Sequence, residues 1–457
     1  MSDGDEWRTF RSVPRRRREL IDWLKEHPSA DYWHEDDWRR LCLDNFATSA
    51  CALCALAREE VWPIDRWREA LQAWSEDKLL NRSWRYIAPV LGGAPDGFLQ
   101  ALAHGVSWWL RASAKTFEAH ATIFLSLCRR VLAMEHQDGM DVGEPVTRAI
   151  NHPVGHVTEA LLRWWYRRSL VDGQSLPEEL RLIFTELCNI QIDKFRHGRV
   201  LLAAHVIALY RVDPDWATVH LLPLFDWQRS AIEVREVWEG FLWSPRLYRP
   251  LIEAIKRPFL DTAQHYESLG THARQYAALL TFAALEPGDT FTSKELADAM
   301  RALPAHGLRD AAQALVRALE GAGDQRADYW AHRVLPYLRS VWPKSRERIT
   351  PAISESLARL CVAAQDAFPE ALEELRYWLQ PLDHPDYAVH RLHDAKLCER
   401  FPDAALTFLD IVAADDTQWP PTHLRRCLED SRAANPQLTA DSRLQRLTEY
   451  LRRHGQA

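Results

Sequence analysis

One short stretch of the chain has the side chains and the spacing that a metal-dependent enzyme could use. Residues 151–159 read NHPVGHVTE, so two histidines and a glutamate follow at intervals of four and three. On one helical face, His152, His156 and Glu159 could hold Zn²⁺ for hydrolysis. Pro153 opposes that interpretation, because the residue before a proline is disfavoured in helical geometry. We therefore expect a turn that leads into a helix, with a metal-dependent hydrolase near these residues as the alternative.

Two further pairs have metal-binding or redox spacing. His390 and His393 lie three residues apart, and Cys51 and Cys54 form a CxxC. The cysteines stand in a run of small apolar residues, without a second CxxC at the distance of a zinc finger. We expect the histidines to lie on a helix surface and the cysteines to be small buried thiols.

Four consecutive arginines, Arg15–Arg18, form a candidate nucleic-acid patch. Residues 1–40 contain nine basic and ten acidic side chains, and the whole chain has a formal charge of −7. Because neither this neighbourhood nor the chain is basic, a solvated helix face is favoured over a DNA-binding arm. Nucleic-acid binding by a helical protein stays as an alternative.

Common catalytic signatures are missing from the sequence. It has no Gly-x-Gly-x-x-Gly, no phosphate loop, no Gly-x-Ser-x-Gly and no His-Glu-x-x-His. We expect a protein without a cofactor or bound metal, and a non-catalytic role is favoured over an enzymatic one.

The elements that would position these residues are predicted to be helices. Only 17 of 457 residues are glycine, and alternating apolar and polar runs bounded by hairpin turns are missing. In 308–319, apolar residues recur at helical spacing, and Thr292 with Glu295 has the pattern of a capping box. The motif Phe-Pro-acid-Ala returns after 33 residues, at Phe368 and Phe401.

Such a period favours an all-α fold, an irregular α-solenoid of HEAT/TPR-like stacked helical hairpins. Breaks rich in Gly, Pro and charge divide it into a Trp-rich helical segment at 1–140, central repeats at 141–288 and C-terminal repeats at 289–457. His-Pro pairs at 27–28, 152–153 and 384–385 are each expected just before a helix.

The sequence also bears on where the protein works. The start of the chain lacks the basic region of a signal peptide, and the eight cysteines are widely spread. The longest apolar run, 200–210, is shorter than the roughly 20 residues that cross a bilayer and is predicted to be a buried helix. We expect a cytoplasmic protein that does not enter a membrane.

Tryptophan is abundant, with 20 in the chain. We expect most of these rings in the core, and any N-terminal ring that is exposed on a concave surface marks the place to look for a partner. Ten lie in the first quarter: Trp7, Trp23, Trp33, Trp38, Trp62, Trp67, Trp74, Trp84, Trp108 and Trp109.

Several packing motifs resemble a known group of proteins. They are YWAHRVLPYL at 329–338, VWPK at 341–344, FPEA at 368–371, LQPL at 379–382 and NHPVGHVTEALL at 151–162. Over about 145–430 the chain resembles the C-terminal helical region of bacterial anti-phage defence proteins that carry an N-terminal sirtuin-like NAD-hydrolysing domain.

The sirtuin-like domain itself is not in these 457 residues, so neither NAD hydrolysis nor a catalytic residue carries over. The resemblance implies the sensing or scaffolding arm of a defence system whose effector is encoded separately, or a remnant of a larger protein. Together with the helical pattern, it leads us to expect a scaffold or regulatory subunit that binds a protein partner.

Overall fold

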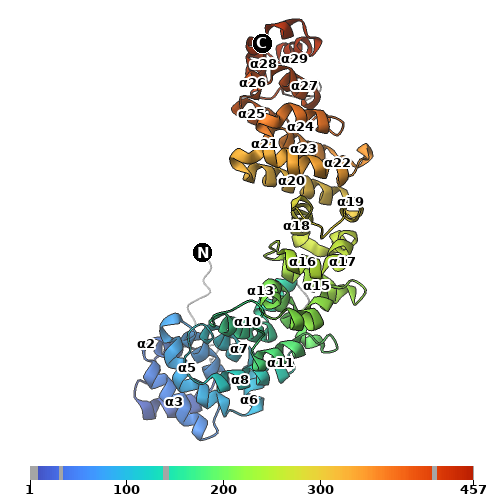
Figure 1. Ribbon diagram of the computed structural model, residues 1–457. Helices are drawn as coiled ribbons and strands as arrows, with labels where there is room; N and C mark the ends of the chain where they lie inside the picture. The colour runs from blue at the N-terminus through green and yellow to red at the C-terminus, as the bar shows by residue number, and fades with distance from the viewer. Residues whose placement is uncertain (1–8, 30–33, 137–143, 414–418, 456–457) are drawn as a thin grey trace. The chain divides into compact units, whose positions relative to one another are not determined.

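The computed structural model describes residues 9–29, 34–136, 144–413 and 419–455. Most of these residues are helical, and they divide into two compact units, Met1–Ser244 and Pro245–Ala457. Within each unit, successive helices pack side by side as an irregular α-solenoid (Figure 1). The predicted fold class is confirmed.

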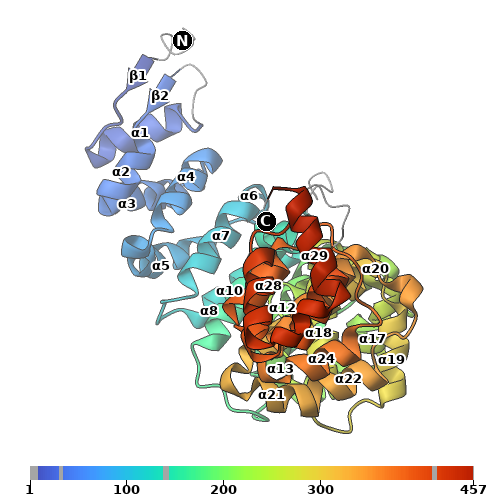
Figure 2. The ribbon, with the colours of Figure 1, turned by 90° about the horizontal axis from the view of Figure 1, so that it is seen from above.

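One short strand pair precedes the helices. Strands β1 (Thr9–Arg11) and β2 (His34–Asp36) run parallel, with Thr9 opposite His34, and lie side by side in Figure 2. They are the only strands in the described ranges, so the expectation of very low strand content is confirmed.

The first unit is built around a row of helices, α4, α7, α10, α12 and α15, each of which packs against the next. Polar contacts between α7 and α10 advance in the same direction along both, from Ser107 with His156 to Arg111 with Glu159, so the two run parallel. The α-helices of this unit are α1 (Arg17–Glu26), α2 (Trp38–Asp44), α3 (Phe46–Arg58), α4 (Ile64–Trp74), α5 (Asp77–Gly92), α6 (Asp96–Ala101), α7 (Ala103–Ser113), α8 (Ala121–Ala133), α9 (Pro145–Asn151), α10 (Pro153–Tyr166), α11 (Glu178–Leu187), α12 (Arg196–Ala204), α13 (Val206–Val212), α14 (Pro214–Trp216) and α15 (Ala231–Leu242).

Two glycines allow unusually close approach in this row. A Cβ at Gly155 would lie 1.7 Å from the carbonyl oxygen of Ala149, and one at Gly240 would lie 2.3 Å from that of Val200. Both obstacles are backbone atoms, which cannot rotate aside as a flexible side chain can. The crossings of α9 with α10 and of α12 with α15 therefore require glycine.

An ion pair between a buried arginine and a half-buried glutamate ties α12 to α15. The Arg199 side chain, 1% exposed, donates from Nε and Nη2 to the two carboxylate oxygens of Glu233, at 2.9 and 3.0 Å. Its Nη1 donates to the carbonyls of Asn189 and Ile192. Because these contacts pair the charge and use all three guanidinium nitrogens, the arginine can be buried.

The second unit is a similar stack, in which α18, α20, α23, α25 and α28 pack in sequence. Figure 1 shows its layers one above another, and Figure 2 looks along the stack, so that its helices overlap. Its α-helices are α16 (Arg249–Ala254), α17 (Lys256–Asp261), α18 (Ala273–Leu285), α19 (Ser293–Ala302), α20 (Ala305–Gly321), α21 (Arg326–Tyr329), α22 (Leu335–Ser340), α23 (Pro351–Ala363), α24 (Phe368–Leu375), α25 (Asp386–Asp394), α26 (Leu397–Arg400), α27 (Pro402–Val412), α28 (Leu424–Ala434) and α29 (Ser442–Arg453).

Local signals in this unit act as predicted. Thr292 caps α19 and Glu295 returns a hydrogen bond to its backbone, which completes the capping box. The apolar positions of 308–319 are buried on one face of α20. Phe401 ends α26 and Pro402 opens α27, with the Phe401 ring centroid 6.4 Å from that of Phe368.

Two π-helical turns follow from prolines. The turns span Ala217–Leu221 and Trp330–Val334, and each is followed two residues later by a proline, Pro223 or Pro336. Proline has no N–H to donate, and its ring clashes with the carbonyl four residues earlier, so the helix accommodates it by widening before it. The second turn carries His332 and Arg333 into a cavity described below.

Three expectations about elements need correction or remain open. His27-Pro28 does not precede a helix, because His27 is the C-cap of α1. The run 200–210 is not one helix but parts of α12 and α13, which meet at His205. The boundary expected at 140/141 lies outside the described residues, and the three-segment division remains a prediction beside the observed units.

Candidate functional site

His152 lies at the start of α10, where it caps the helix. Its φ and ψ of −97° and 145° are extended, and its Nδ1 accepts a hydrogen bond from the backbone N–H of Val154 at 3.2 Å. The ring stacks on His197 of α12, with centroids 4.0 Å apart. The expected turn into a helix is confirmed, and the His152 ring packs against α12.

His156 is fully buried between α10 and α7. Its Nδ1 lies 3.0 Å from Ser107 Oγ, and its ring meets His104 and Trp108 edge-on, at centroid distances of 5.0 and 5.4 Å. Burial, helped by the nearby charge of Arg111, lowers the pKa of His156 to about 3. The imidazole is therefore neutral at physiological pH and is packed as a core side chain.

Both carboxylate oxygens of Glu159 are held by arginines. Oε2 accepts a hydrogen bond from Arg111 Nη1 at 3.1 Å, and Oε1 pairs with Arg163. The three residues of the expected metal site thus have separate partners and are not brought together as ligands. Across the described ranges, no three His, Cys, Asp or Glu side chains are arranged to hold a metal ion.

The seam between α7 and α10 carries a surface that we call the α7–α10 strip. Its aromatic members are Trp108 and Tyr166, which are 38% and 41% exposed. Arg111 lies over the Trp108 ring, 4.1 Å from its centroid, and the Tyr166 hydroxyl is 2.9 Å from His205 Nδ1. The strip comprises Trp108, Arg111, Lys115, Glu159, Arg163, Tyr166 and Arg167.

The charge of the strip is unbalanced. Four cationic side chains accompany a single carboxylate, that of Glu159, which is shared by Arg111 and Arg163. Lys115 and Arg167 are exposed, and Arg167 donates only to a backbone carbonyl, that of Ala114, at 3.3 Å. The strip is therefore locally positive in a chain that is acidic overall.

The tryptophans divide as expected. In the N-terminal set, Trp108 is the one exposed ring among those that the structure describes, and Trp7 and Trp33 lie outside that part of the chain. Trp23 and Trp62 are half-buried. The buried members of the set are Trp38, Trp67, Trp74, Trp84 and Trp109.

The other predicted candidates lie apart from the strip. His390 and His393 are on α25, as expected of a helix surface, and their ring centroids lie 4.7 and 5.2 Å from that of His423. The prediction for the cysteines was wrong in part, because Cys51 is exposed and Cys54 is half-buried on α3. Arg15–Arg18 are exposed, in line with a solvated face.

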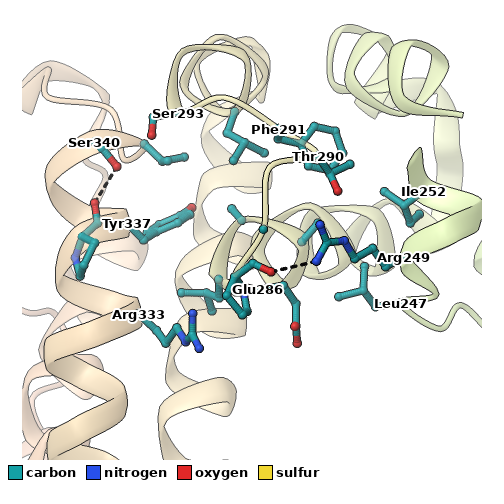
Figure 3. A pocket seen from close by; sticks show the side chains of 18 of the residues that line it. Leu247, Arg249, Ile252, Glu286, Thr290, Phe291, Ser293, Arg333, Tyr337 and Ser340 are labelled. Carbon is teal, nitrogen blue, oxygen red and sulfur yellow. Dashed lines mark hydrogen bonds between the residues drawn. The ribbon is translucent and has the colours of Figure 1, made fainter. Parts of the chain in front are cut away.

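The second unit contains an open cavity of 450 Å³ (Figure 3). Its walls come from α16, the end of α18, the loop before α19, the start of α19, the π-helical turn and α22. Figure 3 shows Glu286 and Arg333 along one edge, and Phe291 and Ile252 on the far side. Sequence reasoning missed this site, because its residues lie far apart along the chain and match no short motif.

Most polar groups around the cavity are already engaged. Glu253 accepts from Arg249 Nε at 2.8 Å and from the Thr290 hydroxyl at 2.7 Å, which stiffens one wall. The buried Tyr337 hydroxyl donates to Met300 Sδ at 3.5 Å, and His332 pairs with Asp328. These contacts hold the walls in place.

No family model matches the chain. It is 28% identical over 130 residues to the uncharacterized protein y4cA of Sinorhizobium fredii (strain NBRC 101917 / NGR234), a match that covers 28% of this chain and 11% of that protein. The chain therefore spans only a small part of that relative's length.

A solved structure, a circular tandem repeat protein with novel repeat topology and enhanced subunit contact surfaces, is 14% identical. The alignment covers 95% of this chain and 90% of that one, at a TM-score of 0.23. In the described ranges, no helix combines the length and the apolar character needed to cross a membrane.

Proposed function

We propose that this protein is a non-catalytic helical-repeat scaffold, or a sensor or regulatory subunit, that binds a protein partner through the α7–α10 strip. The observation that carries the proposal is the exposure of Trp108 beside Arg111 in a locally positive surface. Tryptophan and arginine are the residues most enriched among binding hot spots. The stacked helices hold this surface rigid, so little order has to be gained on binding.

The chemistry of the strip indicates an acidic partner segment. Lys115 and Arg167 are exposed and lack a carboxylate partner among the described residues, so carboxylates of a ligand can approach them. The ring of Trp108 offers apolar area for a neighbouring aliphatic or aromatic side chain. An extended segment that alternates acidic and apolar residues would satisfy both features.

We place this role in bacterial defence against phage, in the cytoplasm, with the effector on a separate polypeptide. This setting is supported by the resemblance of residues 145–430 to the helical region of sirtuin-like defence proteins. The neighbouring genes test this setting, because we expect one of them to encode the effector enzyme.

The direct test is affinity capture from the native host with the full chain and matched variants. Trp108→Ala and the charge reversal Lys115→Glu/Arg167→Glu should each lose a partner that the wild type retains. Trp243→Ala is the control, because Trp243 is also in the first unit, is 51% exposed and lies outside the strip. Equal retention by all variants would refute the strip as the binding surface.

Binding of nucleic acid instead of a protein is the alternative result of this test. Its binding falls steeply with salt, since each neutralised phosphate releases counterions. Capture of single-stranded DNA or RNA that decays steeply with salt, and that is lost in the double charge reversal, would overturn the proposal in favour of a nucleic-acid scaffold.

A further inference from the structure

We propose that the cavity of the second unit binds a small zwitterion with an apolar body, a free apolar amino acid or a short peptide. Its carboxylate would lie at Arg333 and its ammonium group at Glu286. This inference concerns a site in another unit of the chain and does not depend on the α7–α10 strip.

Two opposite charges line the cavity without engaging a partner. In the described structure, neither the Arg333 guanidinium nor the Glu286 carboxylate forms a hydrogen bond or an ion pair, with each other or with another residue. Figure 3 shows both side chains at the same edge of the cavity. Every other charged group in the lining is bonded, since Arg249 is held by Glu253 and the carbonyl of Pro287.

The pairing of the charges selects the class of ligand. A simple anion at Arg333 would be repelled by Glu286, and a simple cation at Glu286 would be repelled by Arg333. A ligand that carries one positive and one negative charge gains two charge-assisted hydrogen bonds, and neither of its charges has to face a protein charge of the same sign. An ammonium and a carboxylate on one small molecule are what amino acids and peptides provide.

The rest of the lining accommodates an apolar body. Side chains of Ile252, Phe291 and Leu296 contribute apolar surface, and Leu247, Leu285 and Val341 extend it. A volume of 450 Å³ lies in the range of about 300–1,000 Å³ that small-molecule sites occupy. The cavity thus offers apolar side chains beside polar and charged groups, so it can take a ligand that has both kinds of surface.

Local structure explains how Arg333 comes to face this space. It lies in the π-helical turn Trp330–Val334, which is widened ahead of Pro336, and π turns recur at functional sites. Relative to a regular α-helix, the wider π turn changes the direction in which the side chains of the turn and those after it point. The turn therefore sets the direction of Arg333 toward the end of α18.

Isothermal titration calorimetry on the full chain tests the proposal with L-phenylalanine and the dipeptide L-leucyl-L-phenylalanine as probes. At least one of these should bind saturably, and the stronger of the two identifies the source of the zwitterion. 3-Phenylpropanoate, which lacks the ammonium, and 2-phenylethylamine, which lacks the carboxylate, should each bind at least about tenfold more weakly. Glycine, which lacks an apolar body, should also bind more weakly.

Two variants locate the site. Arg333→Gln and Glu286→Gln should each weaken binding by about tenfold or more, since each removes one charge-assisted contact. Arg339→Gln is the control, because Arg339 belongs to α22 but pairs with Glu374 and does not line the cavity. Circular dichroism and thermal melting confirm that each variant is folded.

The outcomes divide cleanly. Saturable binding that both cavity variants weaken and the control does not would support the proposal. Failure of both zwitterions to bind, affinity unchanged in Arg333→Gln and Glu286→Gln, or single-charge analogues that bind as tightly as phenylalanine would each overturn it.

Discussion

The replacement Gly155→Ala tests whether the stacked helices depend on close backbone contact. An added Cβ would lie 1.7 Å from the carbonyl oxygen of Ala149 and 2.7 Å from its carbon, so α9 or α10 must shift. Overpacking costs about 1–3 kcal/mol, and a rigid backbone obstacle places this case at the upper end. Alanine is more favourable than glycine in a helix interior by about 1 kcal/mol, which offsets part of this cost. We expect a net loss of about 2 kcal/mol in the free energy of unfolding.

Urea unfolding followed by far-UV circular dichroism measures this loss. Gly97→Ala in α6 is the matched control, because an added Cβ there meets no atom within 4 Å. It should leave stability unchanged or raise it by up to about 1 kcal/mol. Gly240→Ala, whose Cβ would lie 2.3 Å from the carbonyl oxygen of Val200, should behave like Gly155→Ala. Equal free energies of unfolding for Gly155→Ala and Gly97→Ala would contradict the close approach of α9 and α10 at Gly155.

Three further predictions concern stability. Arg199→Met should cost about 1–3 kcal/mol by chemical denaturation, because the carbonyls of Asn189 and Ile192 and the half-buried Glu233 carboxylate lose their donor. For His156, the folded pKa of about 3 lies below the ordinary value of 6.5, so its contribution to stability is present above pH 6.5 and is lost as pH falls toward 3. That loss is roughly 2 kcal/mol by about pH 5, and His156→Gln should flatten this part of a stability-pH profile; an unchanged slope contradicts the burial of a neutral ring. Thr292→Ala should cost about 1 kcal/mol in thermal or urea unfolding by removing the capping box, and no measurable change would count against the cap.

Local signals allowed several elements to be predicted from the sequence. Thr292 and Glu295 satisfy each other within four residues, so the start of α19 is encoded where it occurs. The same holds for the entry of α10, because Pro153 fixes the first turn and excludes the preceding residue from it. The apolar face of 308–319 likewise needs only its own periodicity.

Features that depend on distant parts of the chain could not be predicted. Cys51 is exposed because α3 turns that face to solvent, which depends on where its neighbours pack. His27-Pro28 ends a helix rather than opening one, since proline is compatible with both positions. Glu286 follows α18 and Arg333 lies in the π-helical turn, yet both line the same cavity. The sequence around either residue does not indicate that the other lies nearby.

The α7–α10 strip was anticipated only in part. The sequence indicated that an exposed N-terminal tryptophan would mark a binding surface, but ten rings were available and periodicity alone does not distinguish Trp108 from its buried neighbour Trp109. Arg111 shares α7 with Trp108, but Arg163 lies on α10 and Arg167 at its C-terminal end. Their convergence depends on the parallel packing of α7 and α10.

Site-specific photocrosslinking in the native host tests the central claim most directly. A photoreactive phenylalanine analogue at position 108 should capture one protein partner, and the same analogue at position 243 should capture none. Equal products from both positions, or a product from position 108 that nuclease removes, would contradict a protein-binding role for the α7–α10 strip.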